Sequence, residues 1–319
     1  MTVTPPPTSV RAAVVQAAAI PFDSDACVEK AVELIGRAAA TGARVVVFPE
    51  AFIGGYPKGL NYGLVIGARD AAGREEFRRH LDSAITVPGP HTERLGQAAA
   101  ACGCHVVMGV IEREGGTCYC TVVFFGPDGA LLGKHRKLMP TALERMIWGF
   151  GDGSTLTAID SAYGRIGAVI CWENYMPMLR MAMYAKQVAL YCAPTADDRE
   201  TWLPSMRHIA LEGRCFVLTA CQVLRKDAFP ADVRVSLGDT PDALLMRGGS
   251  AIISPLGVVL AGPHFGDETI LTADLDLHDI GRGKFDFDAV GHYARPDVFQ
   301  LTVNEAPAAP VTVKVEPPQ

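Results

Sequence analysis

Apolar and polar residues recur along the chain with two different periods, which predict strands and helices. Residues 43–50, ARVVVFPE, form a short β-branched run that is typical of a strand buried on both faces. Residues 25–40 instead carry apolar side chains at helical spacing. The polar group from Asp23 to Asp25 offers caps for the start of that helix. We therefore expect a strand over 43–50 and a helix over 25–40.

The same two patterns alternate along the rest of the chain. Further strands are expected at 11–18, 105–111, 118–125, 130–134, 166–170, 188–194 and 215–222. Further helices are expected at 75–81, 91–101, 178–186 and 201–214. The words SAIISP and GVVLAGP indicate a hairpin that turns at Pro255 and Gly257, and residues 225–245 form a polar, irregular surface loop. Because hairpins are mixed with helices, we expect a layered α/β fold of two sheets with helices outside rather than one doubly wound sheet.

No break in composition divides the 319 residues, of which 49% are hydrophobic. A chain of this length can bury a sizeable core. We expect a single domain over residues 1–319. The Pro/Ala/Val-rich tail at about 306–319 is expected to be flexible and unpacked.

The charge of the chain excludes several classes of partner. A net charge of −6 gives no basic field for nucleic acid or acidic lipid. Apolar runs are broken well before the roughly 20 residues that a membrane-spanning helix needs. The first residues, MTVTPPPTSVR, show no secretory signal, and the nine cysteines are an odd number. We therefore expect a cytoplasmic protein with free thiols that binds neither nucleic acid nor membrane.

Four of the cysteines are spaced as two CxC pairs, Cys102 with Cys104 and Cys118 with Cys120. On a strand this spacing places both members of a pair on one face. No CxxC word pairs with a second CxxC or with HxxxH, which is the spacing that structural zinc requires. Small buried thiols explain most of these cysteines better, and no metal is expected.

Three residues whose side chains could take part in catalysis follow apolar, strand-like runs: Glu50, Lys137 and Cys171. Each alone has an ordinary explanation, as a loop carboxylate, a surface ammonium and a core thiol. Strand ends, however, are where rigid sheets present binding groups to a pocket. Together these residues would supply the thiol, carboxylate and ammonium that a thiol hydrolase requires.

A thiol needs a base or a cation nearby to become a thiolate at neutral pH. A carboxylate in a closed pocket gains a raised pKa and can carry a proton, while an ammonium stabilises developing negative charge. The sequence leaves another base open, because His135 or His208 could pair with the thiol instead.

Three words resemble the nitrilase branch of the carbon–nitrogen hydrolase superfamily: VVFPEAFIGGYPKG, GKHRKLMPTALERMIWGFGDGSTL and GAVICWENYMPMLRMAMYAK. The resemblance runs from about Val10 to Leu301, which would be the core of the domain. It implies a four-layer α-β-β-α sandwich whose subunits pair as dimers and extend into larger spirals. CWE at Cys171 is similar to the true nitrilases rather than to the amidase branches.

The resemblance also implies a role for each polar residue. Glu50 would be the general base, Lys137 the stabiliser of the oxyanion and intermediates, and Cys171 the nucleophile. Glu144 would orient Lys137 and the attacking water. No metal or organic cofactor has a role in this chemistry.

Four further residues are candidates for the substrate pocket. By resemblance Tyr56 lines it, although a packing role for this tyrosine is equally open. The indole ring of Trp172 would line the pocket, and its backbone N–H would donate a hydrogen bond to the developing anion. Thr141 and Thr195 are weaker candidates.

The expected reaction is hydrolysis of an organic nitrile to a carboxylic acid and ammonia. Trp148 and Phe150 add apolar surface, which would suit an aromatic or arylaliphatic nitrile. An amidase or carbamoylase, or a cyanide-hydrolysing relative, would use the same triad and stays open. A protein of another class, an inactive assembly or sensing protein with the same fold, is a further alternative. His292 and Arg295 resemble a family word and are expected to serve structure or assembly.

Overall fold

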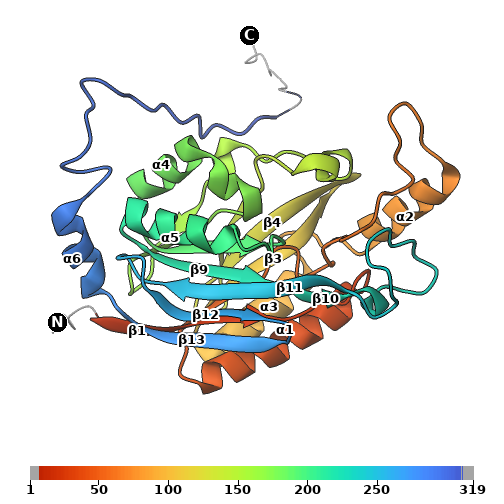
Figure 1. Cartoon of the computed structure of the whole chain (residues 1–319), viewed down its shortest axis with the longest axis horizontal. Coiled ribbons are helices and arrows are strands. Elements are labelled where there is room, and N and C mark those ends of the chain that lie inside the picture. Colours follow the sequence, from red (N-terminus) through yellow and green to blue (C-terminus); the bar gives the residue numbers. More distant parts are fainter. Residues whose placement is uncertain (1–6, 310, 312–319) are drawn as a thin grey trace, which may run out of the picture.

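The computed structural model describes residues 7–309 and 311, and its strands form two mixed β-sheets (Figure 1). The first sheet has the strand order β13-β1-β2-β3-β4-β5. Its strands are β1 (Ser9–Gln16), β2 (Val45–Val47), β3 (His105–Glu114), β4 (Thr117–Phe125), β5 (Leu131–Arg136) and β13 (Thr269–Asp276). Within it, β2 runs parallel to both β1 and β3, whereas β13, β4 and β5 pair antiparallel.

The second sheet has the order β10-β11-β9-β8-β7-β6, and β12 pairs with β11 as an additional strand. Its strands are β6 (Ala158–Ile159), β7 (Arg165–Ala168), β8 (Val188–Thr195), β9 (Phe216–Cys221), β10 (Val223–Arg225), β11 (Leu244–Ile253) and β12 (Val259–Phe265). Here β7, β8 and β9 run parallel, and β11 joins them antiparallel through β9.

Helices cover the outer faces of both sheets. The α-helices are α1 (Ser24–Ala40), α2 (Ala71–Asp82), α3 (Pro90–Cys102), α4 (Pro177–Ala185), α5 (Trp202–Gly213) and α6 (His278–Asp286). Short 3-10 turns are η1 (Ala142–Met146), η2 (Gly153–Thr155), η3 (Cys171–Tyr175) and η4 (Lys226–Ala228). In Figure 1, α4 and α5 lie on one side of the two sheets, and α1 and α3 lie on the other.

Three buried clusters separate these layers. One joins side chains of α1 and α3 to the outer face of the first sheet, and another joins α4 and α5 to the second sheet. The third lies between the sheets and combines residues such as Val107 of β3 with Leu218 of β9. The predicted four-layer α-β-β-α sandwich is therefore confirmed.

Most predicted elements are present, with shifted ends. Asp23 caps α1 by accepting a hydrogen bond from the Ala26 N–H at 2.9 Å. The strand predicted over 43–50 is regular only over Val45–Val47, since residues 48–49 have no regular structure and a turn begins at Glu50. The hairpin at Pro255 is present as β11 and β12.

The sequence prediction lacks β13 and α6, as well as the short strands β6 and β10. In β13 threonine and aspartate alternate with the apolar residues, and the strand lies at the edge of its sheet, where partial exposure permits such a sequence. It nevertheless pairs with β1 over eight residues. Cys102 ends α3, so the spacing of Cys102 and Cys104 is not that of a strand pair, whereas Cys118 and Cys120 share the inward face of β4.

The C-terminal segment crosses the α4 side of the molecule without regular structure (Figure 1). Lys186 binds Glu305, and the Ala308 N–H donates to Asp152 at 2.7 Å. Of the tail predicted at 306–319, residues 306–309 and 311 are exposed, and the others lie outside the described residues. No helix in the described part of the chain is long and apolar enough to cross a membrane.

Candidate active site

The three residues that follow strand-like runs meet in the space between the two sheets. Glu50 lies three residues beyond β2, and Lys137 directly follows β5 of the same sheet. Cys171 opens η3, three residues beyond β7 of the other sheet. All three side chains are buried. Residues far apart in the sequence are thus brought together by the stacking of the sheets.

Lys137 is held between two carboxylates. Its Nζ donates to Glu50 Oε1 at 2.7 Å and to Glu144 Oε2 at 2.8 Å. Burial raises the pKa of the Glu50 carboxyl, and the Lys137 ammonium opposes that rise. Burial acts to lower the pKa of Lys137, but neighbouring anions, Glu50 foremost, outweigh it and hold its pKa well above the ordinary value. Lys137 therefore stays charged, and the carboxylate beside it can take up a proton.

Glu144 is fixed on three sides. Besides Lys137, its Oε2 accepts from the Thr141 backbone N–H at 2.6 Å, as the third residue of a capping box that opens η1. Its Oε1 accepts from the Tyr56 hydroxyl at 2.5 Å. Tyr56, predicted as a substrate residue, therefore also restrains the second carboxylate.

Cys171 adopts a left-handed backbone conformation, with φ at +52°. For a residue with a side chain this costs about 1–2 kcal/mol. Asn174 holds the turn, because its Nδ2 donates to the Cys171 carbonyl at 2.8 Å and to the Val169 carbonyl at 2.9 Å. The hydrogen bonds of Asn174 thus hold Cys171 in this strained backbone conformation.

The sulfur of Cys171 accepts a hydrogen bond from Thr195 at the end of β8, with 3.2 Å between Oγ1 and Sγ. The same Oγ1 accepts from the Asp197 N–H, which directs the hydroxyl proton to the sulfur. Burial, and then the charge of Glu50, raise the pKa of the Cys171 thiol to about 12. The resting side chain is therefore a thiol, and a base must remove its proton.

Sequence reasoning missed three residues that position Glu50. The Cys120 thiol donates to Glu50 Oε1 at 3.4 Å, and Gln222 Nε2 donates to the Glu50 carbonyl at 2.8 Å. Gly109 of β3 lies so close that an added Cβ would stand 2.9 Å from the Glu50 Cα. Only the CxC spacing offered a signal, since it placed Cys118 and Cys120 on one face of a strand.

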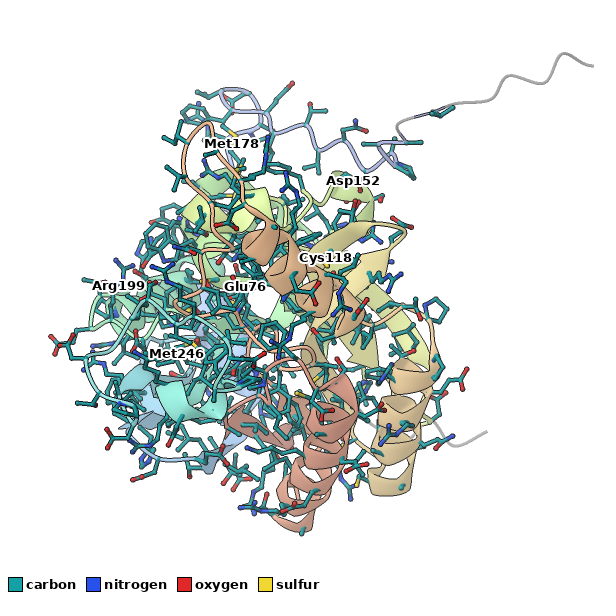
Figure 2. All side chains as sticks on the ribbon, turned by 90° about the vertical axis from the view of Figure 1, so that its right-hand side faces the viewer. Glu76, Cys118, Asp152, Met178, Arg199 and Met246 are labelled. Carbon is teal, nitrogen blue, oxygen red and sulfur yellow. The ribbon has the colours of Figure 1, made fainter. Side chains whose placement is uncertain are left out.

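Two adjoining cavities reach Glu144 and share Tyr56, Lys58, Thr141 and Glu144 as lining residues, whereas Glu50 and Lys137 line neither of them. The thiol cavity, about 260 Å³, is also lined by Cys171, Trp172 and residues 196–199. The tail cavity, about 240 Å³, is otherwise mainly apolar and is lined by Pro57, Gly59, Leu60, Tyr62, Ala142, Leu143 and Ile147. Arg199, at the thiol cavity, is labelled in Figure 2 together with Glu76 of α2.

The three remaining aromatic candidates, Trp172, Trp148 and Phe150, differ in whether they line a cavity. Trp172 lines the thiol cavity and is 42% exposed, with its indole N–H donating to Asp197 at 2.8 Å. Trp148 is buried behind Tyr56, with its ring 5.7 Å from Lys137 Nζ, and lines neither cavity. Phe150 is half exposed and also lies outside both cavities. The expectation that Trp148 and Phe150 form the pocket surface is wrong.

Neither histidine that the sequence left open contacts the thiol. His135 is buried, but its ring nitrogens lie 3.0 Å from Glu173 Oε2 and 3.0 Å from the Thr155 carbonyl. His208 is exposed on α5 beside Glu212. Glu50, not a histidine, is the charged group that acts most on the Cys171 thiol. Across residues 7–309 and 311, no three His, Cys, Asp or Glu side chains are grouped so as to hold a metal ion.

Comparison with known proteins gives a consistent result. A family model described as carbon–nitrogen hydrolase matches residues 11–285. The chain is 61% identical over 307 residues to an "Aliphatic nitrilase" of Sinorhizobium fredii, covering 96% of this chain and 99% of that protein. It is 57% identical to a "Bifunctional nitrilase/nitrile hydratase" of Lupinus angustifolius, covering 95% and 88% of the two chains. The crystal structure of Saccharomyces cerevisiae Nit3, of the nitrilase superfamily, matches with a TM-score of 0.70 at 22% identity, over 90% of this chain and 97% of that chain.

Proposed function

The chain belongs to the carbon–nitrogen hydrolase family, in its nitrilase branch, and on that premise we propose that it hydrolyses an organic nitrile to a carboxylic acid and ammonia. The observation that carries this proposal is Lys137 held between Glu50 and Glu144 beside the buried Cys171 thiol. The names of close relatives support the nitrile as substrate.

In the first step Glu50 accepts the Cys171 proton and the sulfur adds to the nitrile carbon. The nitrile nitrogen takes the proton from Glu50, which leaves a thioimidate on the enzyme. Glu50 Oε2, which is buried and has no partner within the described residues, is the oxygen available for this transfer. The raised pKa of Glu50 suits it to hold the proton between the two events.

In the second step Glu50 removes a proton from water, which adds to the thioimidate carbon. Lys137 has three N–H donors, two of which bind Glu50 and Glu144. The third is available to the negative charge of the tetrahedral intermediate, together with the Trp172 backbone N–H. Proton transfer to nitrogen releases ammonia and leaves a thioester, which a second water hydrolyses to the acid and the free thiol.

The same tetrahedral intermediate can expel the sulfur instead of ammonia, and the product is then an amide. The relative named as a bifunctional nitrilase/nitrile hydratase favours this second outcome as a side reaction. Nothing in the chemistry requires a metal or an organic cofactor.

We propose an aromatic or arylaliphatic nitrile as the substrate, with the nitrile carbon at Cys171 and the organic group in the tail cavity. Apolar side chains such as Leu60, Leu143 and Ile147 line that cavity. Its volume of about 240 Å³ exceeds the roughly 150 Å³ that accommodates benzene in an engineered apolar cavity. Because one relative is named as an aliphatic nitrilase, open-chain nitriles are included in the assay that tests this proposal.

One experiment tests both reaction and substrate. Purified protein is assayed for ammonia over matched panels of aryl, arylacetic and aliphatic nitriles, the corresponding amides, and cyanide, with acid and amide products both quantified. We expect turnover of nitriles, fastest for the aromatic and arylaliphatic members, and its loss in Cys171→Ala. Faster turnover of the amide panel would favour the amidase alternative, and a Cys171→Ala variant of parental activity would contradict the proposed nucleophile.

We also propose that the chain self-associates as a dimer and as larger spirals in the cytoplasm. Large apolar side chains are exposed on three helices that lie outside the sheets: Met178 of α4, Leu211 of α5 and Phe285 of α6. The cysteines are free thiols, which suits a reducing compartment. Light scattering after gel filtration tests the proposal, and a monomer at micromolar concentration would contradict it.

A further inference from the structure

Glu173 lies two residues after Cys171 and is fully buried, although it neither touches Lys137 nor lines the cavities. Its Oε1 accepts from the Leu138 N–H at 2.6 Å. Its Oε2 accepts from the Ile170 N–H at 2.9 Å and lies 3.0 Å from His135 Nε2. One carboxylate therefore gathers three donors in the interior.

Two of these donors are the backbone neighbours of the proposed catalytic residues. Leu138 follows Lys137 at the end of β5, in the first sheet. Ile170 precedes Cys171 beyond β7, in the second sheet. The Glu173 side chain thus joins the backbone that carries the ammonium to the backbone that carries the thiol.

The surroundings of His135 define its protonation state. One ring nitrogen faces the Glu173 carboxylate and the other faces the Thr155 carbonyl of η2, both at 3.0 Å. Both partners are acceptors, so both ring nitrogens must carry a proton to satisfy them. A neutral imidazole would turn a lone pair toward one of the two oxygens.

Charge favours the same state. Glu173 is the charged group that acts on His135 from the elements packed around it. Burial acts to lower the pKa of His135, but the carboxylate outweighs it and the pKa lies above the ordinary value. A buried carboxylate is stable only when it is paired and hydrogen-bonded, and here an imidazolium and two N–H groups provide both.

We propose that Glu173 and a doubly protonated His135 form a positioning pair that fixes Lys137 and Cys171 relative to each other across the two sheets. This inference rests on the proposed function, because the groups it positions are the proposed base, stabiliser and nucleophile. Misplacing reacting groups by about 1 Å can cost on the order of 100-fold in rate. The pair would therefore act on the catalytic step more than on substrate binding.

The kinetic test compares Glu173→Gln and His135→Gln with Glu112→Gln. Glu112 is the matched control, because it is an equally buried carboxylate. It pairs at 2.6 Å with Arg136, which lies on the same strand as His135. We expect both variants of the pair to lose about 100-fold in kcat with KM changed less than about threefold. The rate at which iodoacetamide alkylates Cys171 should change by at least tenfold in both variants of the pair. Glu112→Gln should keep kcat and the alkylation rate within about twofold of the parent values.

The double variant and a spectrum complete the test. Because the residues act as one unit, His135→Gln combined with Glu173→Gln should lose little more than either change alone. The ¹⁵N NMR spectrum of protein labelled with ¹⁵N-histidine should show the signals of one imidazolium at pH 8, and these signals should disappear in His135→Gln. If Glu173→Gln fails to fold, Glu173→Asp serves instead, and it should fold and show a partial loss of kcat.

The inference is wrong if the variants of the pair fold and keep kcat and the alkylation rate within about twofold, or if His135 is neutral in the spectrum. These outcomes differ from failure of the proposed function. A Cys171→Ala variant that still hydrolyses nitriles would contradict the function, whereas alkylation and the spectrum would still report on the pair.

Discussion

Lys137 illustrates how a buried charge becomes useful at this site. An isolated ammonium in the interior would lose its proton, but two carboxylates at 2.7 and 2.8 Å keep it charged. The Cys171 thiol beside them stays protonated because its pKa is raised to about 12. These protonation states support the proposed proton transfer through Glu50 rather than a permanent thiolate.

Tyr56 offers a test of this arrangement at a single atom. Tyr56→Phe removes only the hydroxyl that donates to Glu144, so we expect kcat to fall about 10- to 100-fold through misorientation of Glu144 and Lys137. Tyr62→Phe is the matched control, because it lines the same cavity and its buried hydroxyl has no partner in the described part of the chain. Steady-state kinetics on one nitrile measure both, and equal effects would contradict the assigned contact.

His80 gives a pH-dependent prediction. It is buried on α2, and its Nε2 accepts from the Trp148 indole N–H at 3.0 Å. Burial lowers its pKa from 6.5 to about 4, so the unfolded chain binds a proton that the native protein does not. The free energy of unfolding should therefore fall as the pH drops from about 6.5 to 4, by about 3 kcal/mol on account of this side chain.

Urea unfolding at pH 7 and pH 4 measures that loss. His80→Gln should reduce the difference between the two pH values, whereas His208→Gln, at an exposed position on α5, should leave it unchanged. An unaltered difference in His80→Gln would show that other groups control acid stability.

At the level of elements, strand ends carry the site, and this could be predicted from the sequence. Glu50, Lys137 and Cys171 were identified because each follows an apolar run, and the family words added Glu144. Thr195 was also identified, but its hydroxyl contacts the sulfur rather than lining a cavity. Its role and those of the four predicted catalytic residues stay proposals.

Other parts of the site could not be predicted, because they depend on how the two sheets are placed. Gln222 follows β9 and reaches the Glu50 carbonyl of the first sheet. Glu173 contacts the backbone beyond β5, although it belongs to the turn after β7. The left-handed conformation of Cys171 follows from the contacts that hold η3 and has no signature in a single sequence.

Gly109 tests the packing of an element against the site. An added Cβ would stand 2.1 Å from the Pro49 carbonyl oxygen, so Gly109→Ala must displace the turn that carries Glu50. We expect kcat/KM to fall about 100-fold and the free energy of unfolding to fall by about 1–3 kcal/mol.

Gly116→Ala, in the turn between β3 and β4, is the control for that variant, because an added Cβ there meets nothing within 4 Å. Nitrile kinetics and urea unfolding measure both variants. Parental kcat/KM in Gly109→Ala would show that the Glu50 turn tolerates the shift.

On the scale of the whole molecule, the two sheets share a buried layer, and the proposed reaction takes place at its edge. The inter-sheet cluster contains Cys171 and Cys120 together with the apolar side chains of both sheets. We propose on this basis that the described part of the chain folds as one domain, in which the sheets cannot separate without dismantling the site.

The central claim is that Cys171 alone forms the covalent bond to substrate. Mass spectrometry of enzyme quenched during nitrile turnover and digested with trypsin tests it most directly, because the peptide from Ile166 to Arg180 contains Cys171 as its single cysteine. We predict an acyl or imidoyl adduct on that peptide and on no other. An adduct on the peptide of Cys192 or Cys215, or turnover without any adduct under conditions that trap the intermediate, would contradict the account.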